Sequence, residues 1–316
     1  MKEEIIMKDG EKIATMAINK TKSVKKIKSY LTKDKQIEHL KQEGMIIRNA
    51  KFAKNVLTEV NFYHLKGYWH NQCNNNTFRQ GVTFQEIYNL YKFDSELRRM
   101  IISLLECLEV KLKSYLIDYI AGNWGALGYV NLDNFYESYR IYQKDLLQKI
   151  NQKIQQNNKK PVIYHHIKFY GGNIPIWALM EILSFSDVSK IYANLDLKDT
   201  KKIIKTHYNT KEVTSNVPLV WKWIRTLCDV RNICAHYDRL YNHKLVNPVK
   251  LPEKYKDYNG VNNQLFGALI VLKLLIDDEK MMVDLSKKIE SNIRKYKFKN
   301  LNSIGFPEEW KTILTE

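Results

Sequence analysis

The residues best suited to chemistry lie in one short segment, from Arg231 to Asn242, which reads RNICAHYDRLYN. On a helix of about 100° per residue, its apolar residues face one side and its polar residues the other. Arg231 borders the polar stripe and is long enough to reach over it. Arginine binds phosphate and histidine exchanges protons near neutral pH, so the segment predicts a site for phosphate binding or proton transfer. The stripe contains Asp229, Asn232, His236, Arg239 and His243.

The spacing alone leaves other interpretations open. An arginine followed five residues later by a histidine occurs by chance in many proteins. A polar stripe is also typical of a solvated helix face, or of a hydrogen-bonded network between packed helices.

A long helix is expected to carry this segment. Ser215 and Asn216 are candidate N-caps, and Pro218 is suited to the first turn. No Pro or Gly follows until Pro248, which predicts one helix over about 217–243.

A second long helix is expected to be a pillar of the fold. Thr83 and Glu86 form a capping box for a helix over about 84–91, and Asp94 is a candidate cap for a further helix that ends at Gly122. Glu109 and Lys113 on the latter are spaced for an ion pair, most simply a solvated one.

Further apolar-periodic segments predict a helical bundle. They span about 32–43, 49–57, 135–156, 175–185, a pair that starts near 186 and 199, and 261–295. The chain has 316 residues with only 12 Gly and 6 Pro, which favours helices over a turn-rich β fold. We therefore expect an all-α protein with three parts: an extension at 1–19 with a possible hairpin, a basic and aromatic helical region at 20–82, and a bundle at 83–316.

The charge favours a polyanionic partner. Lys and Arg number 51 against 34 Asp and Glu, a net charge of +17, which indicates nucleic acid first and an anionic membrane second. A lysine-rich proteome would give the same excess. The expected phosphate contacts lie in two basic runs, Lys22, Lys25, Lys26 and Lys28, and Lys287, Lys288, Arg294 and Lys295.

The segment Asn61–Trp69 mixes aromatic and basic residues. Lys66 and Tyr68 are its candidates for holding phosphate and stacking on an unpaired base of RNA. A cluster of aromatic rings buried between helices is the alternative.

Metal binding and membrane insertion are not expected. The four cysteines are scattered and form no C-x2-C pair, which is typical of free thiols in a reducing cytoplasm. No apolar run of 18 residues and no signal peptide are seen, so we expect a cytoplasmic protein without a membrane partner or a cofactor.

The segment also resembles a known signature. Its residues fit RN-x-x-AH-x-x-RL-x-N of the Abi-like abortive-infection proteins of the AbiD and AbiF type, members of the HEPN superfamily. Other stretches resemble landmarks of that family in the same order: QIEHLKQEGMII, NFYHLKGYW, TFQEIYNLYKFDSELRR, IPIWALMEILSFSDVSKIYANL and GFPEEW.

The resemblance implies a HEPN-type bundle that cleaves RNA without a metal. Arg231, His236 and Asn232 would be the catalytic residues, and Arg239 would help to orient RNA. Glu106 or Glu109 would orient His236. The resemblance also implies a homodimer that completes the site, and a toxin held by a structured non-coding RNA antitoxin. An RNA-binding protein that does not cleave, or a protein-interaction module, remains the alternative.

Overall fold

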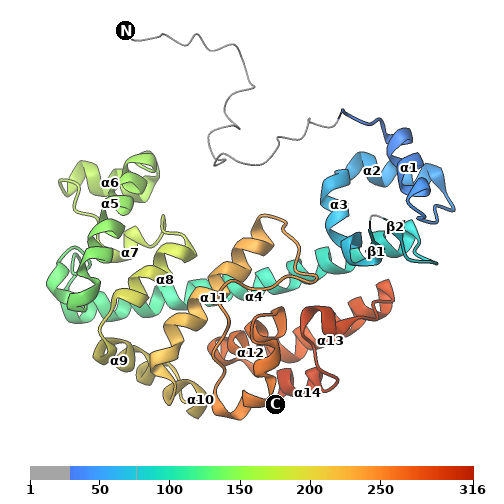
Figure 1. Cartoon of the computed structure of the whole chain (residues 1–316). Helices are drawn as coiled ribbons and strands as arrows, with labels where there is room; N and C mark the ends of the chain where they lie inside the picture. Colours follow the sequence, from blue (N-terminus) through green and yellow to red (C-terminus); the bar gives the residue numbers. More distant parts are fainter. Residues whose placement is uncertain (1–28, 76) are drawn as a thin grey trace, which may run out of the picture.

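The computed structural model describes residues 29–75 and 77–316, and its architecture is helical (Figure 1). Its β structure consists of β1 (Cys73–Asn74) paired antiparallel with β2 (Thr77–Phe78), and one isolated bridge. The expected all-α class is confirmed. The hairpin predicted for 1–19 and the lysines predicted to bind phosphate at 22, 25, 26 and 28 lie outside the described residues.

One helix, α4 (Phe84–Trp124), runs through the molecule for 41 residues. The predicted capping box is present, because the Thr83 hydroxyl accepts the Glu86 N–H while the Glu86 carboxylate accepts the Thr83 N–H. The predicted break at Asp94 is wrong. Its side chain is fully buried and bonded to distant groups, so the residue sits inside a continuous helix. The helix continues past Gly122 to Gly125, whose φ of +84° suits glycine.

The N-terminal helices pack at the first end of α4, beside the small hairpin (Figure 1). They are α1 (Lys33–Gln42), α2 (Ala50–Glu59) and α3 (Phe62–Trp69). Thr32 and Asn49 cap the first two as their side chains accept backbone N–H groups one turn later. Both helices match the predicted segments.

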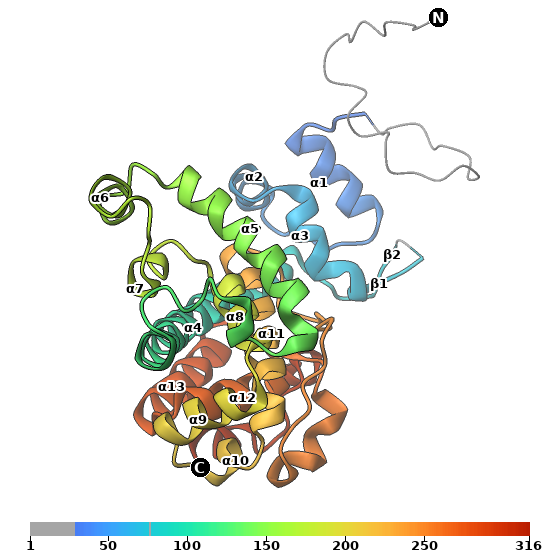
Figure 2. The ribbon, with the colours of Figure 1, turned by 90° about the vertical axis from the view of Figure 1, so that its left-hand side faces the viewer.

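A second group of helices surrounds the other end of α4 (Figure 2). They are α5 (Arg140–Gln156), α6 (Pro161–Phe169), α7 (Ile176–Leu179), α8 (Phe185–Asn194), α9 (Leu197–His207) and α10 (Lys211–Thr214). The helix expected over 175–185 is shorter, since Ser184 starts a new capping box there. Asp196 caps α9, which therefore begins before the predicted start near 199. Asp199 is buried within the helix, where its carboxylate accepts a hydrogen bond from the Tyr119 hydroxyl at 2.6 Å.

Four C-terminal helices complete the bundle: α11 (Val217–Ala235), α12 (Leu265–Ile276), α13 (Glu279–Tyr296) and α14 (Trp310–Thr315). The first three contact α4. Every residue of α12 except Lys273 is buried, so this helix fills the core. Short 3-10 turns lie at His70–Gln72, Leu132–Asn134, Glu137–Tyr139, Glu253–Val261 and Leu301–Ile304.

All four cysteines are free thiols, as predicted. None of the helices in residues 29–75 and 77–316 is long and apolar enough to cross a membrane.

Candidate functional site

The motif lies where α11 ends. Arg231 and Asn232 occupy the last turns of the helix, and His236 is its C-cap. The cap is a Schellman motif, because the Tyr237 N–H donates to the Cys234 carbonyl and the Asp238 N–H to the Ile233 carbonyl. The expected helix over 217–243 is therefore wrong beyond residue 235.

This ending separates the predicted polar stripe into two parts. Arg231 lies in the helix and His236 at its C-cap, five residues later. At about 1.5 Å per residue, their backbones are separated by roughly 7 Å along the helix axis. Arg239 and His243 leave the helix and cannot stack over His236. The His236 side chain is exposed at the end of α11, and Arg231 retains 31% of its side-chain exposure.

Tyr237 occupies the cap position that usually belongs to glycine. Its φ is +62°, a left-handed conformation that is unfavourable for a bulky residue, and 72% of its surface is exposed. Tyr237 is among the apolar residues of the segment that the helical pattern predicts to face the core, and this prediction is wrong.

A buried carboxylate holds the loop that follows. Asp94 of α4 accepts the backbone N–H of Leu240 at 3.2 Å and of Tyr241 at 2.8 Å. It also accepts the Tyr68 hydroxyl at 2.7 Å and pairs with Arg98, and all three side chains are buried. Burial raises the pKa of Tyr68, which keeps its hydroxyl protonated as a donor. We call residues 236–243 the motif loop; α3 and α4 determine its position.

Tyr68 is therefore not available to RNA. It is 1% exposed and lies among Tyr91, Tyr241 and His64. The predicted base stacking by Tyr68 is wrong, and the alternative of a buried aromatic cluster holds. Lys66, by contrast, is exposed on α3.

Glu109 lies beside Arg231, and no ion pair joins it to His236 within the described residues. Its carboxylate is 3.7 Å from the Arg231 guanidinium and 3.0 Å from the Lys113 ammonium, with a side chain only 12% exposed. The expected pair of Glu109 and Lys113 is confirmed, although it is half-buried rather than solvated. Glu106 is exposed on the same helix.

Arg239 lies against α3. A methyl group added at Gly67 would lie 3.6–3.7 Å from the Arg239 side chain, an ordinary van der Waals distance, so this side chain packs directly on the Gly67 turn of α3. The Arg239 charge and, more strongly, burial lower the pKa of His243, and burial together with the Arg98 charge lowers the pKa of His64. Both histidines therefore favour the neutral form, while the charges of Asp94 and Asp238 act on both in the opposite direction. No spacing pattern in the sequence indicates a role for His64.

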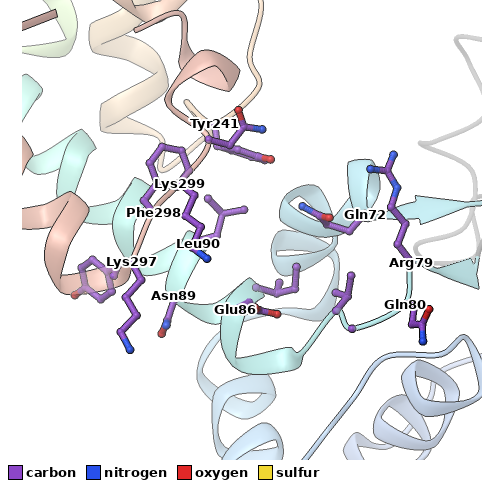
Figure 3. Close-up of a pocket in the computed structure, with 15 residues that line it drawn as sticks. Gln72, Arg79, Gln80, Glu86, Asn89, Leu90, Tyr241, Lys297, Phe298 and Lys299 are labelled. Atoms are coloured by element: carbon purple, nitrogen blue, oxygen red, sulfur yellow. The ribbon is translucent and has the colours of Figure 1, made fainter. Parts of the chain in front are cut away.

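An open cleft of about 530 Å³ lies next to the motif loop (Figure 3). Tyr241 forms one wall, the turn before α4 forms another, and the end of α13 closes it. Arg79, Lys297 and Lys299 line this cleft and make no ion pair within the described residues. Its one carboxylate, Glu86, is occupied by the capping box. The cleft therefore carries net positive charge.

The predicted basic residues of α13 are exposed. Lys287 and Lys288 lie on the surface, Arg294 pairs with Glu290 at 2.7 Å, and Lys295 lies 5.0 Å from the Tyr296 ring. In residues 29–75 and 77–316, no group of three or more His, Cys, Asp or Glu side chains is placed to hold a metal ion.

The family comparison covers the site that the structure assembles. The model of the Abi-like protein family matches residues 55–242, which include α3, α4, α11 and all of the motif loop except His243. No curated protein and no solved structure gives a significant match. The matched region exceeds half of the chain, and the protein therefore belongs to the Abi-like family.

Proposed function

We propose that this protein is an abortive-infection endoribonuclease of the HEPN type that needs no metal ion. The observation that carries the proposal is the exposed pair at the end of α11, with Arg231 in the last turns and His236 at the cap. Membership of the Abi-like family supports a role in abortive infection.

RNA supplies its own nucleophile, so few protein groups are required. A neutral His236 accepts the proton of the 2′-hydroxyl, and that oxygen attacks the adjacent phosphorus. Arg231 binds the non-bridging oxygens and stabilises their developing charge. The P–O5′ bond breaks, an imidazolium gives its proton to the leaving oxygen, and the products carry a 2′,3′-cyclic phosphate and a 5′-hydroxyl.

A homodimer would supply the second acid–base group. One histidine per chain serves as either base or acid, whereas two motif ends brought together offer both at once. Two exposed apolar residues support a contact of this kind: Tyr237 in the motif loop, at 72%, and Val110, at 67%, which follows the Arg231 partner Glu109 in the chain.

The RNA partner also includes an inhibitor in this proposal. A net charge of +17 and the basic cleft beside the motif loop support tight binding of a folded RNA that blocks the site in the cytoplasm. Protein purified from its own cells should carry a discrete RNA, detected by the ratio of absorbance at 260 and 280 nm and identified by sequencing. Protein free of nucleic acid after gentle purification would favour a protein-interaction module.

A second function is favoured by the contact between Arg231 and Glu109. Because a carboxylate already faces the guanidinium, Arg231 is less free to stabilise the charge that develops during cleavage, which favours a protein that binds RNA mainly through its other basic residues and does not cut it. The two functions differ in one assay, in which RNA is incubated with the RNA-free protein, with and without EDTA. Cleavage that continues in EDTA and leaves cyclic phosphate ends supports the nuclease. Cleavage that requires Mg²⁺ contradicts this mechanism, and intact RNA favours the binding protein.

A further inference from the structure

The helix α6 lies at the outer edge of the molecule in both views, on the same side of α4 as the end of α11 (Figures 1 and 2). It rests on the bundle through one buried residue, Ile163. Most of its other side chains face solvent, which is unusual for a helix with such an apolar sequence.

Its exposed side chains are mainly aromatic. Tyr164 is 52% exposed, Phe169 64% and Tyr170 55%, and Trp177 on the contacting helix α7 is 49% exposed. Large aromatic residues gathered on a surface mark a contact site rather than a random distribution. The Lys168 ammonium lies 5.8 Å from the Tyr164 ring and 5.1 Å from the Phe169 ring, so cation and rings form one surface.

This surface has only one sign of charge. From residue 146 to 180 the chain has no Asp or Glu and contains Lys149, Lys153, Lys159, Lys160 and Lys168. Lys153 pairs with Asp187, whereas Lys159, Lys160 and Lys168 make no ion pair within the described residues. We call Lys159, Lys160, Tyr164, Lys168, Phe169 and Tyr170 the α6 surface.

The charge decides which partner fits. A second copy of this chain would bring the same unpaired lysines face to face, and the cores of protein interfaces are depleted in lysine. A polyanion neutralises them. Rings that project from the surface stack on unpaired bases, which a duplex does not offer because its bases already stack on one another.

We propose that the α6 surface binds single-stranded RNA, with bases stacked on Tyr164, Phe169 and Tyr170 and phosphates held by the three lysines. The proposal takes its RNA partner from the proposed function, but the α6 surface contains none of the motif residues. The surface therefore acts as a second attachment point, which adds affinity when one strand also reaches the motif.

The test measures binding of the full chain to a fluorescent 2′-O-methyl strand of about 12 nucleotides, within the site sizes of such surfaces. This strand lacks the free 2′-hydroxyl, so binding is measured without cleavage. Tyr164→Ala, Phe169→Ala and Tyr170→Ala together should raise the Kd at least tenfold. Tyr142→Ala is the matched control, an exposed tyrosine on α5 that lines a small pocket with Asp145, and should change the Kd less than twofold.

A second variant tests the charge. Lys159→Gln, Lys160→Gln and Lys168→Gln together should lower the slope of log K against log salt by about two, at roughly 0.7 per phosphate contact. Three exposed lysines of α9, Lys198, Lys201 and Lys205, changed to Gln are the control and should leave the affinity nearly unchanged. An equal loss in both variants would mean general attraction and would overturn the proposal.

Two other binding partners for the α6 surface, a membrane and a second copy of the chain, are tested by separate measurements. Binding to phosphatidylserine vesicles that the aromatic variant loses, with unchanged binding to the strand, would make the surface a membrane contact. Self-association in sedimentation that the same variant loses, again with unchanged strand binding, would make it a dimer face. Loss of strand binding at the α6 surface and EDTA-resistant cleavage at the motif are measured in separate assays, so failure here is distinguishable from failure of the nuclease proposal.

Discussion

Arg231 shares the carboxylate of Glu109 with Lys113, at 3.7 Å and 3.0 Å respectively. An incoming phosphate must compete with this carboxylate for the guanidinium. The ion pair therefore positions Arg231 and at the same time weakens its attraction for RNA. Spacing alone predicted the contact within α4, but not the contact between α4 and α11.

Glu109→Gln should raise RNA affinity, because it removes a negative charge beside Arg231 and frees both cations. A pair of this kind is worth at most about 1 kcal/mol, which corresponds to roughly fivefold in Kd. Glu106→Gln, an exposed residue one turn earlier, is the matched control and should change the Kd much less. Equal effects of the two changes in a binding titration would mean that Arg231 does not contact RNA.

Tyr237 adopts a left-handed conformation that costs about 1–2 kcal/mol for a residue with a Cβ. Tyr237→Gly relieves this strain, although glycine loses about 0.5–1 kcal/mol more backbone entropy on folding. The melting temperature should therefore stay constant or rise by a few degrees. Cleavage should fall if the exposed ring holds RNA or the second chain. Full activity in this variant would show that the ring has no such role, with Tyr237→Phe as the control that keeps ring and strain.

Among the elements, capped helices were predictable from local sequence. Thr83 accepts the N–H that its predicted capping box requires, and Thr32 and Asn49, the first residues of two predicted segments, accept N–H groups in the same way. Such contacts span three residues, so a short window of sequence contains all the information they need.

Two boundaries were wrong for one shared reason. Asp94 was expected to begin a helix and residues 236–243 to continue one, yet the Asp94 carboxylate binds the backbone of Leu240 and Tyr241. The partners are 146 and 147 residues apart in the chain, and no local pattern contains such a contact. The basic cleft could not be predicted from the sequence for the same reason. Arg79 and Lys297, which are far apart in the chain, line one cleft only after folding.

Asp94→Asn tests whether α4 holds the motif loop. The change replaces the Asp94 carboxylate, which accepts several hydrogen bonds, with a neutral amide and leaves the buried Arg98 without its ion-pair partner. Disruption of a buried ion pair costs about 3–5 kcal/mol of stability. We expect a large fall in the free energy of unfolding, and loss of cleavage at temperatures where the variant remains folded. Glu96→Gln on the same helix, whose partner Arg99 is exposed, should change stability by less than about 1 kcal/mol. Normal cleavage by folded Asp94→Asn protein would show that the loop needs no anchor.

At the scale of the whole molecule, stability should fall as the solution becomes acidic. In the folded protein, burial and then the Arg98 charge lower the pKa of His64, and burial and then the Arg239 charge lower the pKa of His243. The charges of Asp94 and Asp238 oppose both shifts without reversing them. The unfolded chain therefore binds more protons below about pH 6.5, and stability decreases from there downward.

The melting temperature, measured from pH 8 to pH 5.5, should show this decrease. His64→Gln with His243→Gln should flatten it, although His207, whose pKa burial also lowers, will retain part of the slope. His165→Gln, an exposed histidine on α6, is the control. An unchanged slope in the double variant would contradict the assignment of these two histidines.

The proposed activity of the protein depends on the chemistry at the end of α11. The most direct measurement is the single-turnover rate of RNA cleavage, in EDTA, by the RNA-free wild-type protein and by His236→Ala and Arg231→Ala, each with its melting temperature. Removal of an acid–base group should slow cleavage by about 10²–10⁴-fold. Because His236 is exposed, its loss should lower stability by only about 0.5 kcal/mol. Cleavage by His236→Ala at the wild-type rate, or loss of cleavage only through unfolding, would contradict the proposed mechanism.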